Sequence, residues 1–223
     1  MIKSPEQTAR ASRKAAERET RRRFILDAAR DLLTQKAITD ISMDDIAAAA
    51  DYTRRTLYAY FSSRDDIWLC VHLEDLARRW EWQKQHLAGV EGGLARIMVW
   101  AESLYAYWKA HPQSMQVEQY WDFHGIDRHG IGAATFAGFE ALNNELATAL
   151  REMFRDGMAD GSLRTDLPTD ACISQFLYAL RAILGRALSS SYSFTDLDPD
   201  EYVRHYLDQY RHSIGSDSWR AGS

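Results

Sequence analysis

The sequence predicts an all-α fold of about nine helices, and three observations lead to this prediction. Only four prolines and twelve glycines occur in 223 residues, so few positions would interrupt a helix. Apolar residues recur at intervals of three and four in several segments between residues 24 and 214. No segment shows the alternation of apolar and polar residues that is typical of a half-buried strand, and the 46% apolar composition is that of a globular protein.

Four helices are predicted in the first third of the chain, over residues 24–36, 42–50, 53–61 and 63–86. The first carries apolar residues at i, i+3, i+4, i+7 and i+8, which places them on one face. The second and fourth begin with Ser-x-x-Asp, in which the serine oxygen accepts from the first turn and the acids suit the positive helix end. Only two or three residues separate the second helix from the third, which predicts a helix-turn-helix.

Further helices are predicted over residues 94–108, 133–158, 168–191 and 199–214. Pro112 marks a break between the first two of these, and the stretch "DFHGIDRHGIG", which begins at Asp122, is predicted to be a loop. A Gly-containing turn, "ADGSLRTDLP", ends the second of them. The last helix begins with Asp-Pro-Asp-Glu, which supplies an N-cap, a proline at the first helical position and an acid in the first turn.

Charge is unevenly distributed along the chain, whose formal net charge is −5. Residues 1–23 carry eight Lys or Arg against three Glu, whereas residues 67–223 carry fourteen bases against twenty-one acids. This asymmetry is typical of a basic part that meets a polyanion and an acidic part that does not. The alternative is a solvated basic tail. Residues 1–20 are predicted to be either disordered or a helical extension of the first helix.

The stretch "DYTRRTLYAYFSSRDD", residues 51–66, gathers hydrogen-bond donors on one short helix. Leu57 and Phe61 are four residues apart and are predicted to face the core. The outward-facing side chains in its N-terminal half are Arg54, Arg55, Thr56 and Tyr58. Recognition helices contact base edges with such residues, because arginine pairs with guanine and hydroxyls suit phosphate oxygens. The alternative is an exposed polar helix whose arginines form salt bridges.

The segments "FILDAARDLL" and "ISMDDIAAAADYTRRTLYAYFSSRDDIW" resemble the N-terminal DNA-binding domain of the TetR (tetracycline repressor) family. The resemblance covers roughly residues 21–70, and beyond it only the helix count and the turn "DGSLRTDLP" fit. Asp51 and Tyr52 stand where the family usually has Gly-Val, and Asp tolerates the left-handed conformation better than most residues. Arg55 stands where many members have a small residue, and Ala59 where a polar residue is common, so the operator should differ from those of relatives.

The resemblance implies a homodimeric transcriptional regulator, expected to be a repressor, that binds a palindromic double-stranded DNA operator. The residues expected to contact DNA are Ser42, Thr53, Arg54, Arg55, Thr56, Tyr58, Tyr60 and Arg64, the last of them through a phosphate. The implied organisation is a basic extension (1–20), a helix-turn-helix domain (21–66), a helical effector-binding and dimerisation domain (67–215) and a C-terminal tail (216–223). The alternative function is a helical small-molecule-binding protein whose helix-turn-helix is not used for DNA.

Six of the seven tryptophans lie within residues 68–139, where TetR-like proteins enclose an effector. Such aromatic residues at helical spacing also occur in plain cores. A small apolar or aromatic effector is expected, and the pocket candidates are Trp100, Tyr105, Trp108, Tyr120, Trp121 and His124. The resemblance also places the last two helices at the dimer interface, through Phe176, Leu177, Leu180, Leu184, Leu188, Tyr206 and Tyr210.

Neither a metal site nor an enzyme active site is predicted, and no cofactor is expected. His124 and His129, near Asp122 and Asp127, form only a weak metal-ligand pattern. Cys70 and the second cysteine, at position 172, are expected to be reduced thiols, with a disulfide as the alternative. No apolar run approaches the roughly 18 residues that span a bilayer, and the N-terminus lacks the apolar core of a secretory signal. A cytoplasmic protein is therefore expected.

Overall fold

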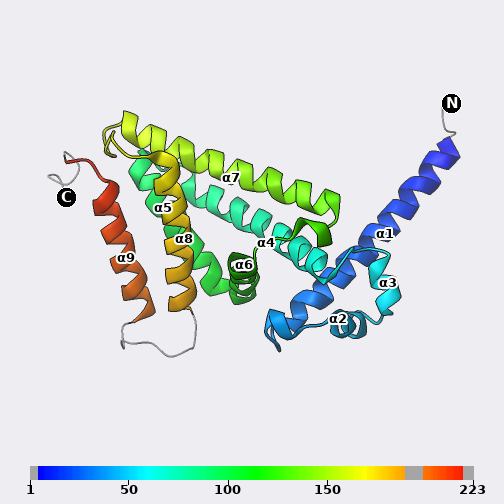
Figure 1. The fold of residues 1–223 in the computed structure, drawn as a ribbon. Coiled ribbons are helices and arrows are strands. Elements are labelled where there is room, and N and C mark those ends of the chain that lie inside the picture. The colour runs from blue at the N-terminus through cyan, green and yellow to red at the C-terminus, as the bar shows by residue number, and fades with distance from the viewer. Residues whose placement is uncertain (1–4, 189–197, 218–223) are drawn as a thin grey trace.

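The computed structural model describes residues 5–188 and 198–217 and is all-α, as predicted (Figure 1). Within this part of the chain the helices are α1 (Pro5–Leu32), η1 (Ile38–Asp40), α2 (Met43–Ala49), α3 (Arg54–Tyr58), α4 (Arg64–Leu87), α5 (Gly93–Ala110), α6 (Pro112–His124), η2 (Arg128–Gly130), α7 (Ala133–Ala159), α8 (Thr169–Ala187) and α9 (Pro199–Ile214). Here α labels an α-helix and η a short 3-10 helix. The only β-pairing among the described residues is an isolated bridge between Leu163 and Gly215.

Several helix boundaries differ from the prediction, and two helices end earlier than predicted, α1 at Leu32 and α3 at Tyr58. The first helix begins at Pro5, so the basic segment is a helical extension wherever it is described, which suits its Ala, Arg, Lys and Glu content. Pro112 does not only break a helix but occupies the first turn of α6, where proline costs no hydrogen bond. That helix runs to His124, so part of the predicted loop is helical. Residues 189–191, which were included in the predicted helix 168–191, lie outside the described residues.

Two apolar cores organise the molecule, and α4 contributes to both. The N-terminal half of α4, including Trp68, packs with α1, α2 and α3, whereas Trp80 belongs to the core formed by α5, α7, α8 and α9. Helix α6 is shared in the same way, because Met115 lies in the second core and Trp121 in the first. In Figure 1, α4 runs from the α1–α3 end toward α5 and α7. These two helices therefore connect the helix-turn-helix to the larger helical part.

None of the described helices combines sufficient length with sufficient apolar character to cross a bilayer.

Candidate DNA-binding surface and internal cavity

Side-chain caps hold α2 and α3 at a tight turn. Ser42 accepts from the backbone N–H of Asp45, and Thr53 accepts from that of Thr56 at 3.2 Å. Between the helices, Asp51 adopts a φ of 53°, the left-handed conformation expected of it in place of glycine. The Tyr52 backbone N–H donates to the α2 carbonyl of residue 47 at 2.9 Å, which closes the turn. The predicted helix-turn-helix is thus present in the structure.

Helix α3 buries one face and exposes the other, as predicted. Leu57 is 0% exposed and Phe61 is 2% exposed, and both lie in the N-terminal core. Arg54 and Tyr58 are exposed and interact, with 3.4 Å between the guanidinium Nη2 and the hydroxyl. Arg55 is also exposed and makes no hydrogen bond or ion pair with any described residue. Its guanidinium donors are free to meet a ligand at this surface.

Unlike Arg55, the other side chains of α2, α3 and the residues beside them that are predicted to contact DNA have partners within the chain. The Thr56 hydroxyl lies 2.9 Å from that of Thr53, and the Ser42 side chain is occupied by its cap. Tyr60 is half-buried, with the guanidinium of Arg18 4.8 Å from its ring centre. Arg54 pairs with Asp44 of α2 at 3.2 Å, so it ties the two helices of the motif together. The side chain of Arg55 is the least restrained of this group.

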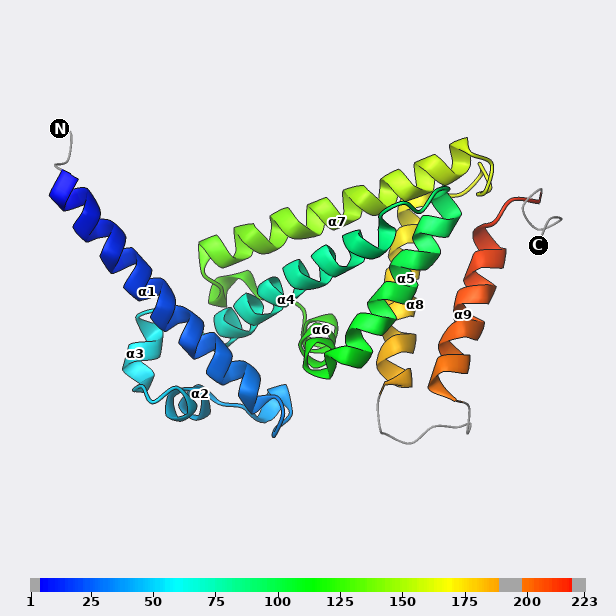
Figure 2. The ribbon, with the colours of Figure 1, turned by 180° about the vertical axis from the view of Figure 1, so that it is seen from behind.

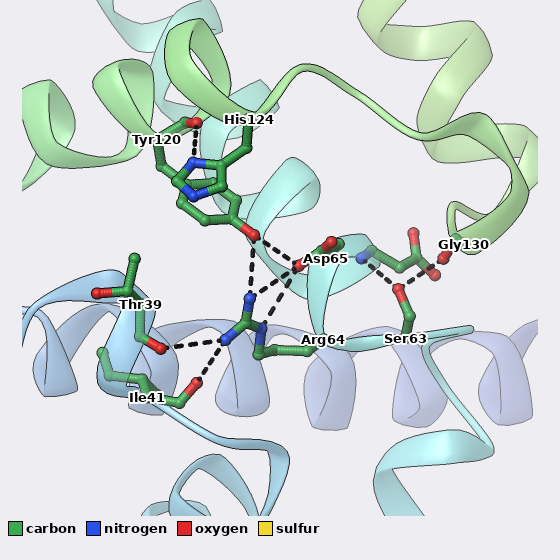
Figure 3. A network of polar contacts seen from close by, with 9 residues as sticks. Thr39, Ile41, Ser63, Arg64, Asp65, Tyr120, His124 and Gly130 are labelled. Carbon is green, nitrogen blue, oxygen red and sulfur yellow. Dashed lines mark hydrogen bonds and ion pairs between the residues drawn. The ribbon is translucent and has the colours of Figure 1, made fainter.

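Arg64, at the start of α4, lies in a hydrogen-bond network between the two parts of the molecule (Figure 3). Its Nη2 donates to the Tyr120 hydroxyl at 3.0 Å, and its Nη1 donates to the carbonyl of Ile41 at 3.3 Å. It also pairs with Asp65 at 3.4 Å. This differs from the predicted phosphate contact, because the guanidinium donors are already directed at groups of the same chain.

Tyr120 and His124 lie at this junction, where their polar groups contact the same chain, and the role predicted for them in a ligand pocket stays a prediction. The Tyr120 hydroxyl donates to Asp65 at 3.0 Å and accepts from Arg64. The His124 ring stacks on that of Tyr120 with 4.4 Å between centres (Figure 3). A second link between the two parts comes from Ser63, whose hydroxyl donates to the carbonyl of Gly130 at 2.6 Å.

A partly open cavity of about 460 Å³, called the internal cavity below, lies among α4, α5, α6, α7 and α8. Of the predicted pocket residues, Trp100 and Trp121 line it, together with Phe139 and Tyr178. Trp108 does not, because it is 0% exposed and fully enclosed by the C-terminal core. Two of the six pocket candidates thus line this cavity, and their contact with an effector stays a prediction.

Tyr105, the remaining pocket candidate, does not line the internal cavity. Its hydroxyl donates to Asp200 of α9 at 2.7 Å, and its ring lies under the ammonium of Lys109. It therefore lines a surface groove between α5 and α9 and not the internal cavity.

A charged cluster, formed by Arg79, Glu118, Asp122 and Arg181, lines the cavity. Glu118 is 5% exposed and accepts from Arg79 at 2.6 Å and from Arg181 at 3.0 Å. Arg181 also pairs with Asp122 at 3.2 Å. Burial acts to raise the pKa of Glu118, but the neighbouring positive charges hold it well below the usual range. Burial instead raises the pKa of Asp122.

The cluster was not predicted, although the sequence contains a signal for it. His72, Leu76, Arg79 and Gln83 follow one another at intervals of four, three and four, so polar residues share the buried face of α4. Glu118 lies three residues from Met115 and from Trp121 on the apolar side of α6. A charge on an apolar helix face needs a buried partner. The partners lie on other helices, and spacing alone does not identify them.

The predicted dimer residues separate into two groups. Phe176, Leu180 and Leu184 are each 0% exposed in the single chain, within its C-terminal core. In the single chain these three side chains stabilise the core and offer no surface to a second copy, and their role in a dimer interface stays a prediction. Partly exposed side chains remain at the other predicted positions, Leu177, Leu188, Tyr206 and Tyr210. Tyr178 of α8, which lies at the edge of the internal cavity, is 66% exposed.

Metal ligands and cysteines were the remaining chemical candidates. Over residues 5–188 and 198–217, no group of three or more His, Cys, Asp or Glu is arranged to hold a metal ion. His129 contacts Asp127 at 3.0 Å, and the His129 side chain is almost fully exposed. Cys70 is a buried free thiol and Cys172 a partly buried one, so the disulfide alternative does not apply. Burial raises the pKa of Cys70 to about 11, which keeps it protonated at neutral pH.

Comparison with known proteins places the helix-turn-helix in a family. Residues 25–69 match the model for bacterial regulatory proteins of the tetR family. A curated protein of Mycobacterium tuberculosis named for mycofactocin biosynthesis, the transcriptional regulator MftR, is 36% identical over 86 residues. That match covers 39% of this chain and 38% of MftR, so the chain spans well under half the length of this relative.

Solved structures resemble the chain over most of its length. A transcriptional regulator from Saccharomonospora viridis, determined in complex with choline, has a TM-score of 0.67 and 17% identity, over 87% of this chain and 97% of the other. The fatty acid degradation regulator FadR from Bacillus halodurans has a TM-score of 0.62 and 14% identity, over 84% and 96%. The ketosteroid regulator KstR2 of Mycobacterium tuberculosis has a TM-score of 0.59 and 15% identity, over 88% and 96%. At such identities these similarities show a common fold.

Proposed function

This chain belongs to the tetR family of bacterial regulatory proteins, and we propose that it is a homodimeric, ligand-responsive repressor. The observation that carries the proposal is the division of α3 into a buried face and a donor-rich exposed face. Arg55 would contact base edges, because its guanidinium is exposed and has no partner among the described residues. Arg54 and Tyr58 would position α3 on the backbone, since one is held by Asp44 and the other presents a hydroxyl.

The effector would bind in the internal cavity between α4 and α8. Its aromatic walls, which include Trp100 and Trp121, suit an apolar or aromatic body. The charged cluster around Glu118 suits a polar head group that exchanges hydrogen bonds with Arg79 or Arg181. We therefore propose an amphipathic effector, which adds a polar head group to the small apolar or aromatic effector expected from the sequence. Choline, which the Saccharomonospora viridis relative contains, belongs in the first panel of test ligands.

Effector binding would reach the DNA-binding helices through α6. Glu118 and Trp121 line the cavity, whereas Tyr120 lies between them in sequence and bonds to Arg64. A ligand that displaces α6 would alter this hydrogen bond. Arg64 in turn bonds to the carbonyl of Ile41, directly before α2. The two recognition helices of a dimer would then change their separation, and the operator would be released without contact between ligand and DNA.

The test is selection of duplexes from a random library by the full chain, followed by titration of the selected operator. A palindromic consensus is expected, together with a loss of affinity when an effector quenches the emission of Trp100 and Trp121. Operator and effector must weaken each other by the same factor. If no sequence is enriched while a ligand still quenches emission, the chain is a helical small-molecule-binding protein that does not use its helix-turn-helix.

A further inference from the structure

The N-terminal half of α1 packs against very little of the protein. Every residue from Arg10 to Arg21 is exposed, whereas burial begins with Ile25 and Leu26. In both views of the fold this part of α1 projects beyond α3, away from α5, α8 and α9 (Figures 1 and 2). A helix segment that buries no apolar face gains little stability from tertiary packing. Its length and its charge therefore need another explanation.

The projecting segment has one predominantly basic face. Arg10, Arg13 and Lys14 follow the i, i+3, i+4 spacing that groups side chains on one side of a helix. None of the three makes a hydrogen bond or ion pair with a described residue. Two acids, Glu6 and Glu17, lie on the same side by helical spacing, whereas Glu19 lies on the opposite side, where it approaches Arg22 at 4.0 Å. The basic stripe, defined here as Arg10, Arg13 and Lys14, thus keeps a net positive charge and has no ion-pair partner among the described residues.

The basic stripe lies on the side of α1 that faces the recognition helix. One turn after Lys14, Arg18 donates to the carbonyl of Ala59 at 2.8 Å, directly after α3, and covers the ring of Tyr60. Arg21 is also within hydrogen-bonding reach of Tyr60. Helical spacing places Arg18 and Arg21 close to the same side as the stripe. A duplex bound to the exposed face of α3 would extend along this surface.

We propose that the basic stripe binds the phosphates of duplex DNA next to the half-site that α3 contacts. Eight residues separate Arg10 from Arg18, which is about 12 Å of helix, or about three to four base pairs. Fully exposed arginine and lysine side chains without partners position a protein on phosphates and carry no base specificity. The stripe therefore adds affinity and lengthens the footprint, while the choice of sequence stays with α3. This inference rests on the proposed DNA-binding function and extends it to a second surface.

The test compares two matched double variants of the full chain. Arg10→Gln/Arg13→Gln removes two charges from the stripe, and Arg151→Gln/Arg155→Gln removes two charges from exposed positions of α7. Each is titrated across salt concentrations with the selected operator on a long duplex and on one trimmed to its half-sites. Each lost phosphate contact lowers the slope of log affinity against log salt by about 0.9. Between about 50 and 200 mM salt, the fold loss of affinity should therefore be about 12 times smaller for the stripe variant than for wild type.

Three results together would support the proposal that the basic stripe binds phosphates beside the half-site. The slope change appears on the long duplex, disappears on the trimmed duplex, and leaves the selected sequence unaltered, while the α7 variant behaves as wild type. Equal slopes for the stripe variant and wild type on the long duplex overturn the proposal, as does a slope change that persists on the trimmed duplex. If the full chain selects no sequence, the proposed repressor function fails, and the same titration on a long unselected duplex still decides whether the stripe binds phosphates.

Discussion

The guanidinium of Arg64 donates to the hydroxyl of Tyr120 at 3.0 Å, which connects the first residue of α4 to α6. The same hydroxyl donates to Asp65 at 3.0 Å, so one oxygen holds two successive residues of α4. Both carbonyls that Arg64 contacts, those of Thr39 and Ile41, precede the helix-turn-helix. A single phenol thus connects a helix of the cavity wall to the DNA-binding part.

Tyr120→Phe should weaken the coupling between operator and effector while leaving each site intact. The variant loses the hydroxyl that bonds to Arg64 and Asp65 but keeps the ring that stacks on His124. A hydrogen bond worth about 1 kcal/mol corresponds to about a fivefold smaller coupling factor. The measurement is effector affinity with and without operator. Tyr105→Phe is the control, because it removes a hydroxyl that bonds to Asp200, away from the junction. An unchanged coupling factor in Tyr120→Phe would exclude this route.

Arg55→Ala should relax base preference at one operator position and cost about 1–3 kcal/mol, the usual value of a bidentate base contact. Arg54→Ala should weaken all duplexes to a similar extent, since Arg54 ties α3 to Asp44 of α2. Both variants are compared by affinities for the selected operator and its single-base substitutions. If Arg55→Ala weakens every duplex equally, Arg55 is a phosphate contact and the base reader lies elsewhere on α3.

Leu180→Arg and Tyr178→Arg should behave differently if the exposed part of α8 forms the dimer. Leu180 is 0% exposed, so a charge there disrupts the core of the single chain and lowers the free energy of unfolding. Tyr178 is 66% exposed, so the same substitution leaves the monomer folded and repels a second copy. Sedimentation and circular dichroism distinguish the two results. A folded Tyr178→Arg variant with an intact dimer would place the interface away from this residue.

Helix starts were predictable because a few neighbouring residues determine them. Ser42, Thr53, Ser63 and Asp198 each accept from the backbone N–H three residues later, as the sequence pattern indicates. The orientation of α8 was not predictable in this way. Its apolar stripe identifies a face that must be buried, but the pattern is the same whether the covering surface belongs to the same chain or to a partner.

The charged cluster shows why the cavity was only partly predicted. Glu118 lies 39 positions from Arg79 and 63 from Arg181, and no local pattern relates residues so far apart. Trp100 and Trp121 were predicted as pocket residues because the sequence between residues 68 and 139 is rich in aromatic residues. Tyr105, Trp108 and Tyr120 share that density, and only the packing of α5 and α6 determines which rings face the cavity.

Glu118→Leu should destabilise the chain by about 3–5 kcal/mol, because it leaves the buried charge of Arg79 without its partner. The matched control is Glu118→Leu/Arg79→Met, which removes both charges and should recover much of the loss. The free energy of unfolding in urea, measured near neutral pH, tests both variants. A double variant as unstable as the single one would show that packing and not the ion pair is responsible.

The same pair predicts how stability changes with pH. The pKa of Glu118 in the folded chain lies below its ordinary value of 4.5, because Arg79, His72 and Arg181 favour the carboxylate against the cost of burial. Its contribution is therefore complete above about pH 4.5 and is lost as the pH falls toward the folded pKa of about 2. Burial also lowers the pKa of His72, so protonation of this residue removes stability as the pH falls below 6.5. Unfolding measured from pH 7 downward should show both losses in wild type, whereas Glu118→Leu/Arg79→Met should lack the one below pH 4.5. If this variant loses stability below pH 4.5 as steeply as wild type, other carboxylates cause the acid sensitivity.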